Sequence, residues 1–247
     1  MTELKEIYGY LKELAPLELA EDWDNPGLLV DCGRPVERIL TCLDITGPVV
    51  REAQEKGCDL VVSHHPVIFR PLKALQEGQV PCLLLKAGIS AICMHTNLDA
   101  APGGVNDTLA QRMGLREVEP FAEGMGRIGW INEMSAHQLA QETARVLHAR
   151  VQWADGGKPI RRLALITGSG CSMLEDAIRA GADALLTGEA SHHAALDALA
   201  AGVTLVAAGH YATEFPVAQT LATRLGDRFR NLEVLVSETD RDPYHYL

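Results

Sequence analysis

The sequence predicts an α/β protein made of two similar α/β domains with mostly parallel sheets. Short apolar segments of strand length alternate with amphipathic segments of helix length, which is the pattern of βα units. The spacing of residues in the first half of the chain is repeated in the second half. At 247 residues and 47% hydrophobic side chains, the chain is long enough to give each domain its own core.

The first half begins with a helix over residues 2–14, where apolar side chains recur at helical spacing and Thr2 is the candidate cap. Turn-forming residues follow and lead into further strands and helices. We expect strands at 28–30, 39–43, 61–63 and 91–94, helices at 46–56 and 82–86, and an exposed loop at 96–104.

The glycine-rich segment 119–129 is the candidate boundary between the two halves, because it lacks a long apolar run. A helix capped by Ser135 then opens a second alternating series. We expect helices at 135–149, 173–180 and 193–200 and strands at 163–167, 184–187 and 204–208. The predicted domains are therefore residues 1–122 with 210–247, and residues 123–209.

Two stretches support a duplication. Residues 52–64 carry the pattern Glu-Ala-x-x-x-Gly-x-Asp-x-x-x-Ser-His, and residues 176–188 carry Asp-Ala-x-x-x-Gly-x-Asp-x-x-x-Thr-Gly. Any two βα units share some features, so resemblance by chance is the alternative. A true duplication would place equivalent strand ends, with the loops that follow them, in comparable positions of the two domains.

Composition excludes several classes of protein. The formal net charge of −11 disfavours a general nucleic-acid surface but not a small anionic ligand, since bound cations would reverse the local charge. No apolar run approaches the roughly 18 residues of a membrane span, and the first residues lack the pattern of a signal peptide. We therefore expect a cytoplasmic protein. Six cysteines without a C-x-x-C pair are expected to be reduced and structural.

Histidines and carboxylates follow four of the predicted strands. Neutral imidazole is the commonest metal ligand among side chains, and adjacent histidines at a strand end can each reach a different ion. With no thiolate among them, the set favours a first-row divalent ion over a structural zinc cluster. The candidates are His64, His65, His95, Asp99, Glu189, His192, His193, His210 and Glu214.

Each candidate also has a plainer interpretation. A single histidine at a strand end is more often a hydrogen-bonded edge residue, and His210 and Glu214 can simply pair within one helical turn. The turn Gly168-Ser169-Gly170 lacks the lysine of a phosphate-binding loop. No G-x-S-x-G motif of a nucleophile elbow is present.

The combined motifs resemble the NIF-three-like dinuclear metal-binding family, whose members are commonly labelled GTP cyclohydrolase I type 2 homologues. The resemblance runs from residue 23 to residue 214, and the direct join of Pro120 to the Gly126 motif indicates the short form without an inserted domain. The motifs are Trp23-Asp24-Asn25-x-Gly27-Leu28, Ser63-His64-His65-Pro66-x-x-Phe69, His95-Thr96-Asn97-x-Asp99, Gly126-Arg127-x-Gly129, Thr187-Gly188-Glu189 and Gly209-His210-x-x-x-Glu214.

The resemblance implies a dinuclear metal site in the cleft between the domains and a ring-shaped homohexamer. It implies two divalent ions per subunit, with Zn, Fe, Mn, Co and Ni equally compatible. The implied metal ligands are His64, His65, Asp99, His210 and Glu214, with Glu214 bridging the ions. His95 and His193 match positions that line the cleft, which implies that they either support the metal ligands or transfer protons. The chain departs from the family at Glu189, where aspartate followed by Lys-Tyr-His is frequent.

The implied activity is that of a metal-dependent hydrolase. In the cyclohydrolase interpretation, water activated by two ions opens the imidazole ring of guanine and releases formate. The alternatives are a metal-dependent hydrolase of another phosphoester or nucleotide, and a non-catalytic protein that binds metal or a partner. In the catalytic interpretations the partner is a small anionic substrate.

Overall fold

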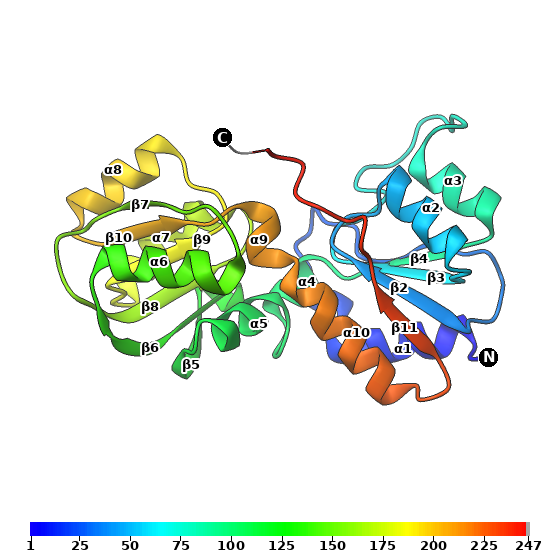
Figure 1. The fold of residues 1–247 in the computed structure, drawn as a ribbon, viewed down its shortest axis with the longest axis horizontal. Helices are drawn as coiled ribbons and strands as arrows, with labels where there is room; N and C mark the ends of the chain where they lie inside the picture. The colour runs from blue at the N-terminus through cyan, green and yellow to red at the C-terminus, as the bar shows by residue number, and fades with distance from the viewer. Residues whose placement is uncertain (246–247) are drawn as a thin grey trace. The chain divides into compact units, whose positions relative to one another are not determined.

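The computed structural model describes residues 1–245, and the chain divides into two compact units. Unit 1 comprises Met1–Pro102 and Val217–Leu247, and unit 2 comprises Gly103–Pro216. Each unit is an α/β fold with its own sheet (Figure 1). The α/β class and the presence of two similar folds are therefore as the sequence predicts.

Unit 1 contains a five-stranded sheet in the order β1-β4-β3-β2-β11. Its four strands β4, β3, β2 and β11 are parallel, and β1 joins the edge in the antiparallel direction. The strands are β1 (Gly27–Val30), β2 (Arg38–Cys42), β3 (Leu60–Ser63), β4 (Ser90–Cys93) and β11 (Glu233–Val236).

Helices cover both faces of the sheet in unit 1. Helices α2 and α3 lie on one face, and α1 and α10 lie on the other (Figure 1). Side chains alternate across the strands accordingly: Leu40 packs into the core under α2 and α3, whereas Thr41 donates a hydrogen bond to the Ala218 carbonyl of α10. The helices are α1 (Leu4–Leu14), η1 (Leu17–Leu19), α2 (Gly47–Glu55), α3 (Val80–Ala87), α4 (Thr96–Ala100) and α10 (Pro216–Arg228).

Unit 2 contains a six-stranded sheet in the order β5-β6-β8-β9-β10-β7. Only its central strands β8, β9 and β10 are parallel, and the flanking strands are antiparallel. The mostly parallel pairing expected from the sequence thus describes the first sheet and the centre of the second. The strands are β5 (Arg116–Phe121), β6 (Gly126–Met134), β7 (Gln152–Ala154), β8 (Ile160–Ile166), β9 (Ala184–Thr187) and β10 (Thr204–Ala207).

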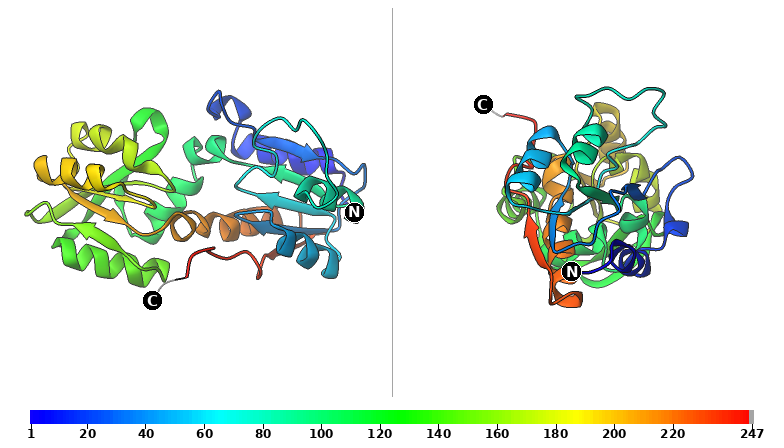
Figure 2. Two further views of the ribbon diagram at one scale, coloured as in Figure 1. Left: turned by 90° about the horizontal axis from the view of Figure 1, so that it is seen from above. Right: turned by 90° about the vertical axis from the view of Figure 1, so that its right-hand side faces the viewer.

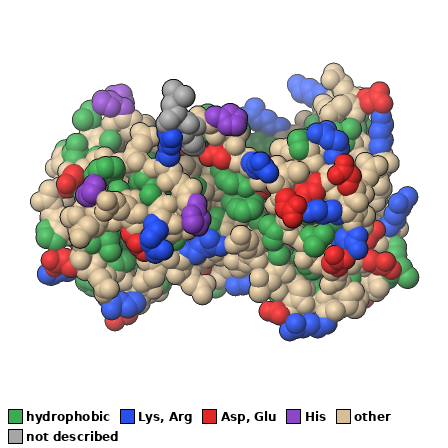
Figure 3. Space-filling view, viewed as in Figure 1, with side chains coloured by type: hydrophobic (Ala, Val, Ile, Leu, Met, Phe, Trp, Pro, Cys, Tyr) green, Lys and Arg blue, Asp and Glu red, His purple; other side chains and the backbone are tan. Residues whose placement is uncertain are grey.

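The sheet of unit 2 lies between two helical layers (Figure 2). Helices α5 and α6 share one apolar core with the sheet, and α7 and α8 share the core on the opposite face. The helices are α5 (Val105–Arg112), η2 (Ala122–Gly124), α6 (Ala136–Leu147), η3 (Gly170–Met173), α7 (Leu174–Arg179), α8 (His192–Ala200) and α9 (His210–Glu214). Acidic and basic side chains are interspersed on the face of each unit drawn in Figure 3.

The segment expected to separate the domains is instead a hairpin inside unit 2. Strands β5 and β6 pair in register from Pro120 opposite Arg127 to Phe121 opposite Gly126. The tight connection explains the glycines there, because Gly124 has a φ of 95°. The units divide at 102/103 and 216/217 rather than at the expected 122/123 and 209/210, since pairing with β6 holds β5 in the second sheet.

The segment expected as an exposed loop at 96–104 begins as helix α4, and Thr96, Asn97 and Leu98 are buried. The polar side chains are buried because they have partners: Asn97 donates to the Ala15 carbonyl at 2.8 Å, and Thr96 donates to Asp24. A polar composition therefore did not mean exposure here.

The duplicated pattern corresponds to equivalent hydrogen bonds in the two units. The carboxylate of Asp59 accepts from the backbone N–H groups of residues 37 and 38 at 2.8 and 3.1 Å. The carboxylate of Asp183 accepts from residues 161 and 162, both at 2.9 Å. In each unit the aspartate therefore fastens the start of one parallel strand to the start of the next.

Glu52, on α2, fastens the C-terminal segment of the chain to unit 1. Its buried carboxylate accepts hydrogen bonds from Ser237, from the backbone N–H of Glu238 at 2.8 Å, and from Thr239. Lys56 donates to the same carboxylate at 2.8 Å. Burial by itself would raise the pKa of Glu52, but these hydrogen bonds outweigh it and lower the pKa to about 2.

We predict that Glu52→Gln lowers the free energy of unfolding at pH 7 by roughly 2 to 3 kcal/mol, because the amide cannot replace a carboxylate that accepts from several donors. Since the folded pKa is depressed, the wild type keeps this contribution above its ordinary pKa of 4.5 and loses it as the pH falls toward about 2. Urea denaturation at pH 7, 4 and 3 should show the two proteins converging. The exposed Glu55→Gln is the matched control, and an equal loss in both variants would contradict the prediction.

Candidate metal centre

Three imidazoles gather at the carboxyl ends of two neighbouring strands in unit 1. His64 and His65 follow β3, which ends because Pro66 cannot continue a ladder, and His95 follows β4. One ring nitrogen of each histidine lies within 4.8 Å of the others, a spacing at which a metal ion can be held. His64 is fully buried, whereas His65 and His95 are partly exposed.

Each of the three rings is fixed through its Nδ1 atom. His64 Nδ1 is 2.8 Å from the Met94 carbonyl oxygen. His65 Nδ1 is 2.9 Å from Asp44 Oδ1, and His95 Nδ1 is 2.7 Å from Asp24 Oδ1.

Carbonyl and carboxylate oxygens only accept, so each Nδ1 carries the proton and each Nε2 of the neutral ring has a lone pair. Metal-binding histidines are held by the same kind of contact. The three rings are thereby in the tautomer that a cation requires.

Asp99 joins this cluster from the helical turn after β4. The backbone N–H of Asp99 donates to the His95 carbonyl at 3.1 Å, which brings the side chain back toward the strand end. Asp99 Oδ1 lies 3.6 Å from Nε2 of His64, and its side chain is only 14% exposed. A carboxylate therefore stands beside the most deeply buried imidazole.

Unit 2 holds a second donor group at the end of β10. Gly209 has a φ of 91° and lets the chain turn directly into α9. One turn of α9 brings His210 Nε2 to 2.9 Å from Glu214 Oε2, and the Glu214 side chain is 6% exposed. Glu189 lies on the other side of the ring, 3.5 Å from His210 Nδ1.

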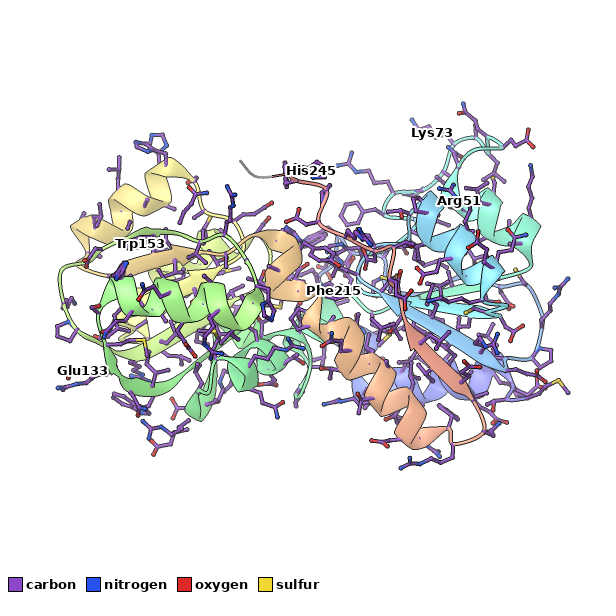
Figure 4. All side chains as sticks on the ribbon, viewed as in Figure 1. Arg51, Lys73, Glu133, Trp153, Phe215 and His245 are labelled. Carbon is purple, nitrogen blue, oxygen red and sulfur yellow. The ribbon has the colours of Figure 1, made fainter. Side chains whose placement is uncertain are left out.

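Phe215, at the end of α9, stacks on Tyr211 with 4.9 Å between the ring centroids (Figure 4).

Gly168, after β8, leaves the space that the Glu214 carboxylate occupies. Its φ is +58°, a Cβ there would overlap Glu214 Oε1, and the same Cβ would lie 3.2 Å from His210 Nε2. Thr213 helps to fix this turn, because its hydroxyl accepts from the Gly168 N–H at 3.1 Å. Gly168, which resembles part of a phosphate-binding loop in the sequence, thus leaves room for the Glu214 carboxylate.

The donor chemistry of both groups fits a divalent metal ion. Imidazole nitrogen and carboxylate oxygen suit Zn, Mn, Fe, Co and Ni, and Nδ1 anchoring presents the correct nitrogen in unit 1. The nearby Cys93 is a poor thiolate ligand, because burial raises the pKa of its thiol well above its ordinary value.

The structure brings His64, His65, His95 and Asp99 together in unit 1, and His210 with Glu214 in unit 2. His193 is exposed in the first turn of α8, with its ring 5.8 Å from that of His192. The roles of these residues as metal ligands or proton carriers remain predictions.

Sequence reasoning missed the carboxylates that orient the rings. Asp24 lies in the Trp23-Asp24-Asn25 motif, but the motif alone does not indicate that its carboxylate contacts His95. Its carboxylate accepts from His95, from the Thr96 N–H at 3.0 Å and from the Thr96 hydroxyl at 2.5 Å. Burial raises the pKa of Asp24, but these bonds outweigh it and lower the pKa to about 2. The carboxylate therefore stays ionised and holds His95 over a wide pH range.

Asp240 lies in the C-terminal segment, outside every motif of the sequence. Its carboxylate accepts from the backbone N–H groups of Leu43 at 2.5 Å and Asp44 at 3.4 Å. It therefore fixes the loop whose Asp44 holds His65. Burial raises the pKa of Asp240 to about 6.

The fold and these donor groups define a class of two-unit α/β proteins with a histidine- and carboxylate-rich site suited to metal. The chain belongs to the Duf34/NIF3 (NGG1p interacting factor 3) family, whose model matches residues 2–243.

Two relatives and one solved structure illustrate the match. Proteins called "GTP cyclohydrolase 1 type 2 homolog" from Streptomyces coelicolor and Streptococcus pneumoniae are 34% and 32% identical, covering 99% and 98% of this chain and 94% and 98% of theirs. The crystal structure of the Staphylococcus aureus hypothetical protein SA1388 is 31% identical with a TM-score of 0.93, covering 100% of this chain and 99% of the other. The family resemblance inferred from the motifs is thereby confirmed.

We predict that Gly168→Ala lowers zinc affinity at least about tenfold, because the new methyl group displaces the Glu214 carboxylate from its place beside His210. Gly114→Ala is the matched control, since Gly114 has a φ of +69° with nothing within 4 Å of the added Cβ. Calorimetric titration with zinc gives the affinity of each variant. Both substitutions strain a backbone of positive φ, so a lower affinity in Gly168→Ala alone reports the overlap with Glu214. Equal zinc affinity in the two variants would contradict this assignment for Gly168.

We predict that Asp24→Asn loosens the His95 ring and lowers the free energy of unfolding by about 2 kcal/mol, because an uncharged amide binds the N–H and O–H donors of Asn25, His95 and Thr96 less strongly. Nitrogen-15 NMR of the imidazoles should show a mixture of tautomers for His95 in the variant and the Nδ1–H form alone in the wild type. The exposed Asp22→Asn on the same loop should change neither quantity.

Proposed function

We propose that the protein is a dinuclear metal-dependent hydrolase of the GTP cyclohydrolase type. The observation that carries the proposal is the uniform anchoring of His64, His65 and His95 through Nδ1. Three rings fixed in one tautomer, with ring nitrogens within 4.8 Å of one another, form a preorganised set of donors rather than unrelated edge histidines.

The proposed ligands are His64, His65 and Asp99 of unit 1 and His210 and Glu214 of unit 2. In this proposal His64 and His65 would each hold a different ion, and Glu214 would be a ligand to both. Two divalent ions held in this way supply an activated water and stabilise charge on the attacking and leaving atoms.

His95 is the proposed proton carrier. Its Nδ1–H is held by Asp24, so Nε2 of the neutral ring can accept a proton from the attacking water and later return it to the leaving group. Asp24 then stabilises the protonated ring. We propose His193 as a second carrier on the basis of the family resemblance.

The names of the relatives support GTP as the substrate, since they are called homologues of GTP cyclohydrolase 1 type 2. In that reaction one water adds to C8 of guanine and the five-membered ring opens to a formamide, and a second water hydrolyses the formamide and releases formate. The family resemblance also supports a ring-shaped homohexamer, which native mass would test.

Among residues 1–245, no helix is both long and apolar enough to cross a membrane.

We predict that protein purified without oxygen carries two divalent ions per subunit and releases formate from GTP. Metal content and turnover should be measured on the same sample, together with native mass. His65→Ala and Glu214→Gln should each lower turnover at least about 100-fold and reduce the metal content, because each removes one donor. His137→Ala, which changes an exposed histidine of α6, is the control.

Metal-loaded protein that leaves GTP untouched but hydrolyses phosphoesters or other nucleotides would overturn the cyclohydrolase assignment. Metal-loaded protein without turnover of any of these substrates would overturn hydrolysis and leave a metal-binding or partner-binding role. Unchanged metal content in both His65→Ala and Glu214→Gln would overturn the ligand set.

A further inference from the structure

Two large aromatic side chains stand exposed beside the histidine cluster of unit 1. Trp23 is 59% exposed and Phe69 is 43% exposed. Their ring centroids are 5.9 Å apart with a 55° angle between the planes. Exposure of so much aromatic surface costs free energy in water, and a contact with a ligand would recover it.

The backbone that carries these two rings is fixed by specific contacts. Asn25 Nδ2 donates to the Ile68 carbonyl at 2.6 Å, which ties the loop of Trp23 to the loop of Phe69. Asp24, between Trp23 and Asn25, is held by His95 and Thr96. A surface fixed in this way binds a ligand without the entropic cost of ordering the loops.

Both rings meet His95 edge to face. The centroid of His95 is 6.2 Å from that of Trp23 at 78°, and 6.4 Å from that of Phe69 at 81°. His95 is in turn 5.2 Å from His64 and 5.5 Å from His65. A planar ring stacked on the exposed aromatic face would therefore lie next to the imidazole cluster.

The charge of the loop after His65 favours an anionic group on the same ligand. The loop from residue 64 to residue 79 contains Arg70 and Lys73, and its single carboxylate, Glu77, pairs with Lys86 of α3. Arg70 and Lys73 are exposed, and Figure 4 places Lys73 on this loop between β3 and α3. The loop thus combines an aromatic face with positive charge, the combination that binds bases joined to phosphates.

We infer that Trp23 and Phe69 form the surface that binds the planar heteroaromatic ring of a phosphate-bearing substrate and holds that ring against His95. This deepens the proposed function and rests on it for the identification of the bound molecule as a substrate. Binding of the ring itself requires no turnover, so the two proposals can fail separately.

The test is equilibrium binding of GMP, AMP and ribose 5-phosphate to the full-length protein, with and without zinc. Calorimetry gives the affinities, and quenching of Trp23 emission in a Trp130→Phe/Trp153→Phe background reports stacking. We expect GMP and AMP to bind and quench, and ribose 5-phosphate, which lacks the ring, to bind at least about tenfold more weakly. Trp23→Leu should weaken GMP binding roughly 5- to 100-fold, and Trp23→Phe should retain most of the affinity, because stacking needs a π face.

Trp153→Leu is the matched control, since Trp153 is 46% exposed on β7 of unit 2. Equal affinity for ribose 5-phosphate and GMP would overturn the inference, as would unchanged GMP binding in Trp23→Leu. If Trp23→Leu and Phe69→Leu form smaller assemblies than the wild type but bind GMP with unchanged affinity, the two side chains instead form a contact between copies of the chain. If GMP binding depends on Trp23 but metal-loaded protein shows no turnover, the proposed function fails, and Trp23 and Phe69 still form a surface that binds the ring of a phosphate-bearing ligand.

Discussion

The hydrogen bond from His95 to the Asp24 carboxylate, at 2.7 Å, connects most of the features of unit 1. The same carboxylate holds Thr96 at the start of α4, and α4 carries Asp99 to the buried His64. The loop that contains Asp24 also presents Trp23 and is tied to the loop of Phe69. One buried carboxylate therefore orients an imidazole, starts a helix and fixes an aromatic surface.

A second set of contacts reaches His65 from the end of the chain. Glu52 holds residues 237–239, which places Asp240 against the loop that carries Asp44. Asp44 then orients His65. The C-terminal segment thus supports the cluster through backbone hydrogen bonds, although none of its residues is a candidate ligand. Such supporting contacts determine how well a metal site is preorganised, because a donor in the wrong orientation must be reordered when the ion binds.

The donor groups of each unit follow a similar arrangement of strands and helices. In both units three parallel strands run in sequential order with a helix between each pair, and an aspartate fastens two strand starts. The third strand then ends at Cys93, two residues before His95, in unit 1 and at Ala207, three residues before His210, in unit 2. His95 directly precedes α4, and His210 begins α9; each of these helices has five residues. The carboxylate of Asp99 in α4 lies near His64, and the carboxylate of Glu214 in α9 lies near His210. The same βα arrangement therefore presents a histidine and a carboxylate in each unit.

The sequence by itself determined the α/β class, the repeated unit and the residues at the strand ends, because strand periodicity and the i, i+4 spacing are local properties of the chain. It also carried the motifs that identify the family. Only the tertiary structure showed that β5 belongs to the second sheet, that Thr96 and Asn97 are buried, and that Asp24, Asp44 and Asp240 orient the donors. These facts depend on contacts between residues distant in sequence, such as Asp24 with His95 and Asp240 with Leu43, and no local pattern encodes such a pairing.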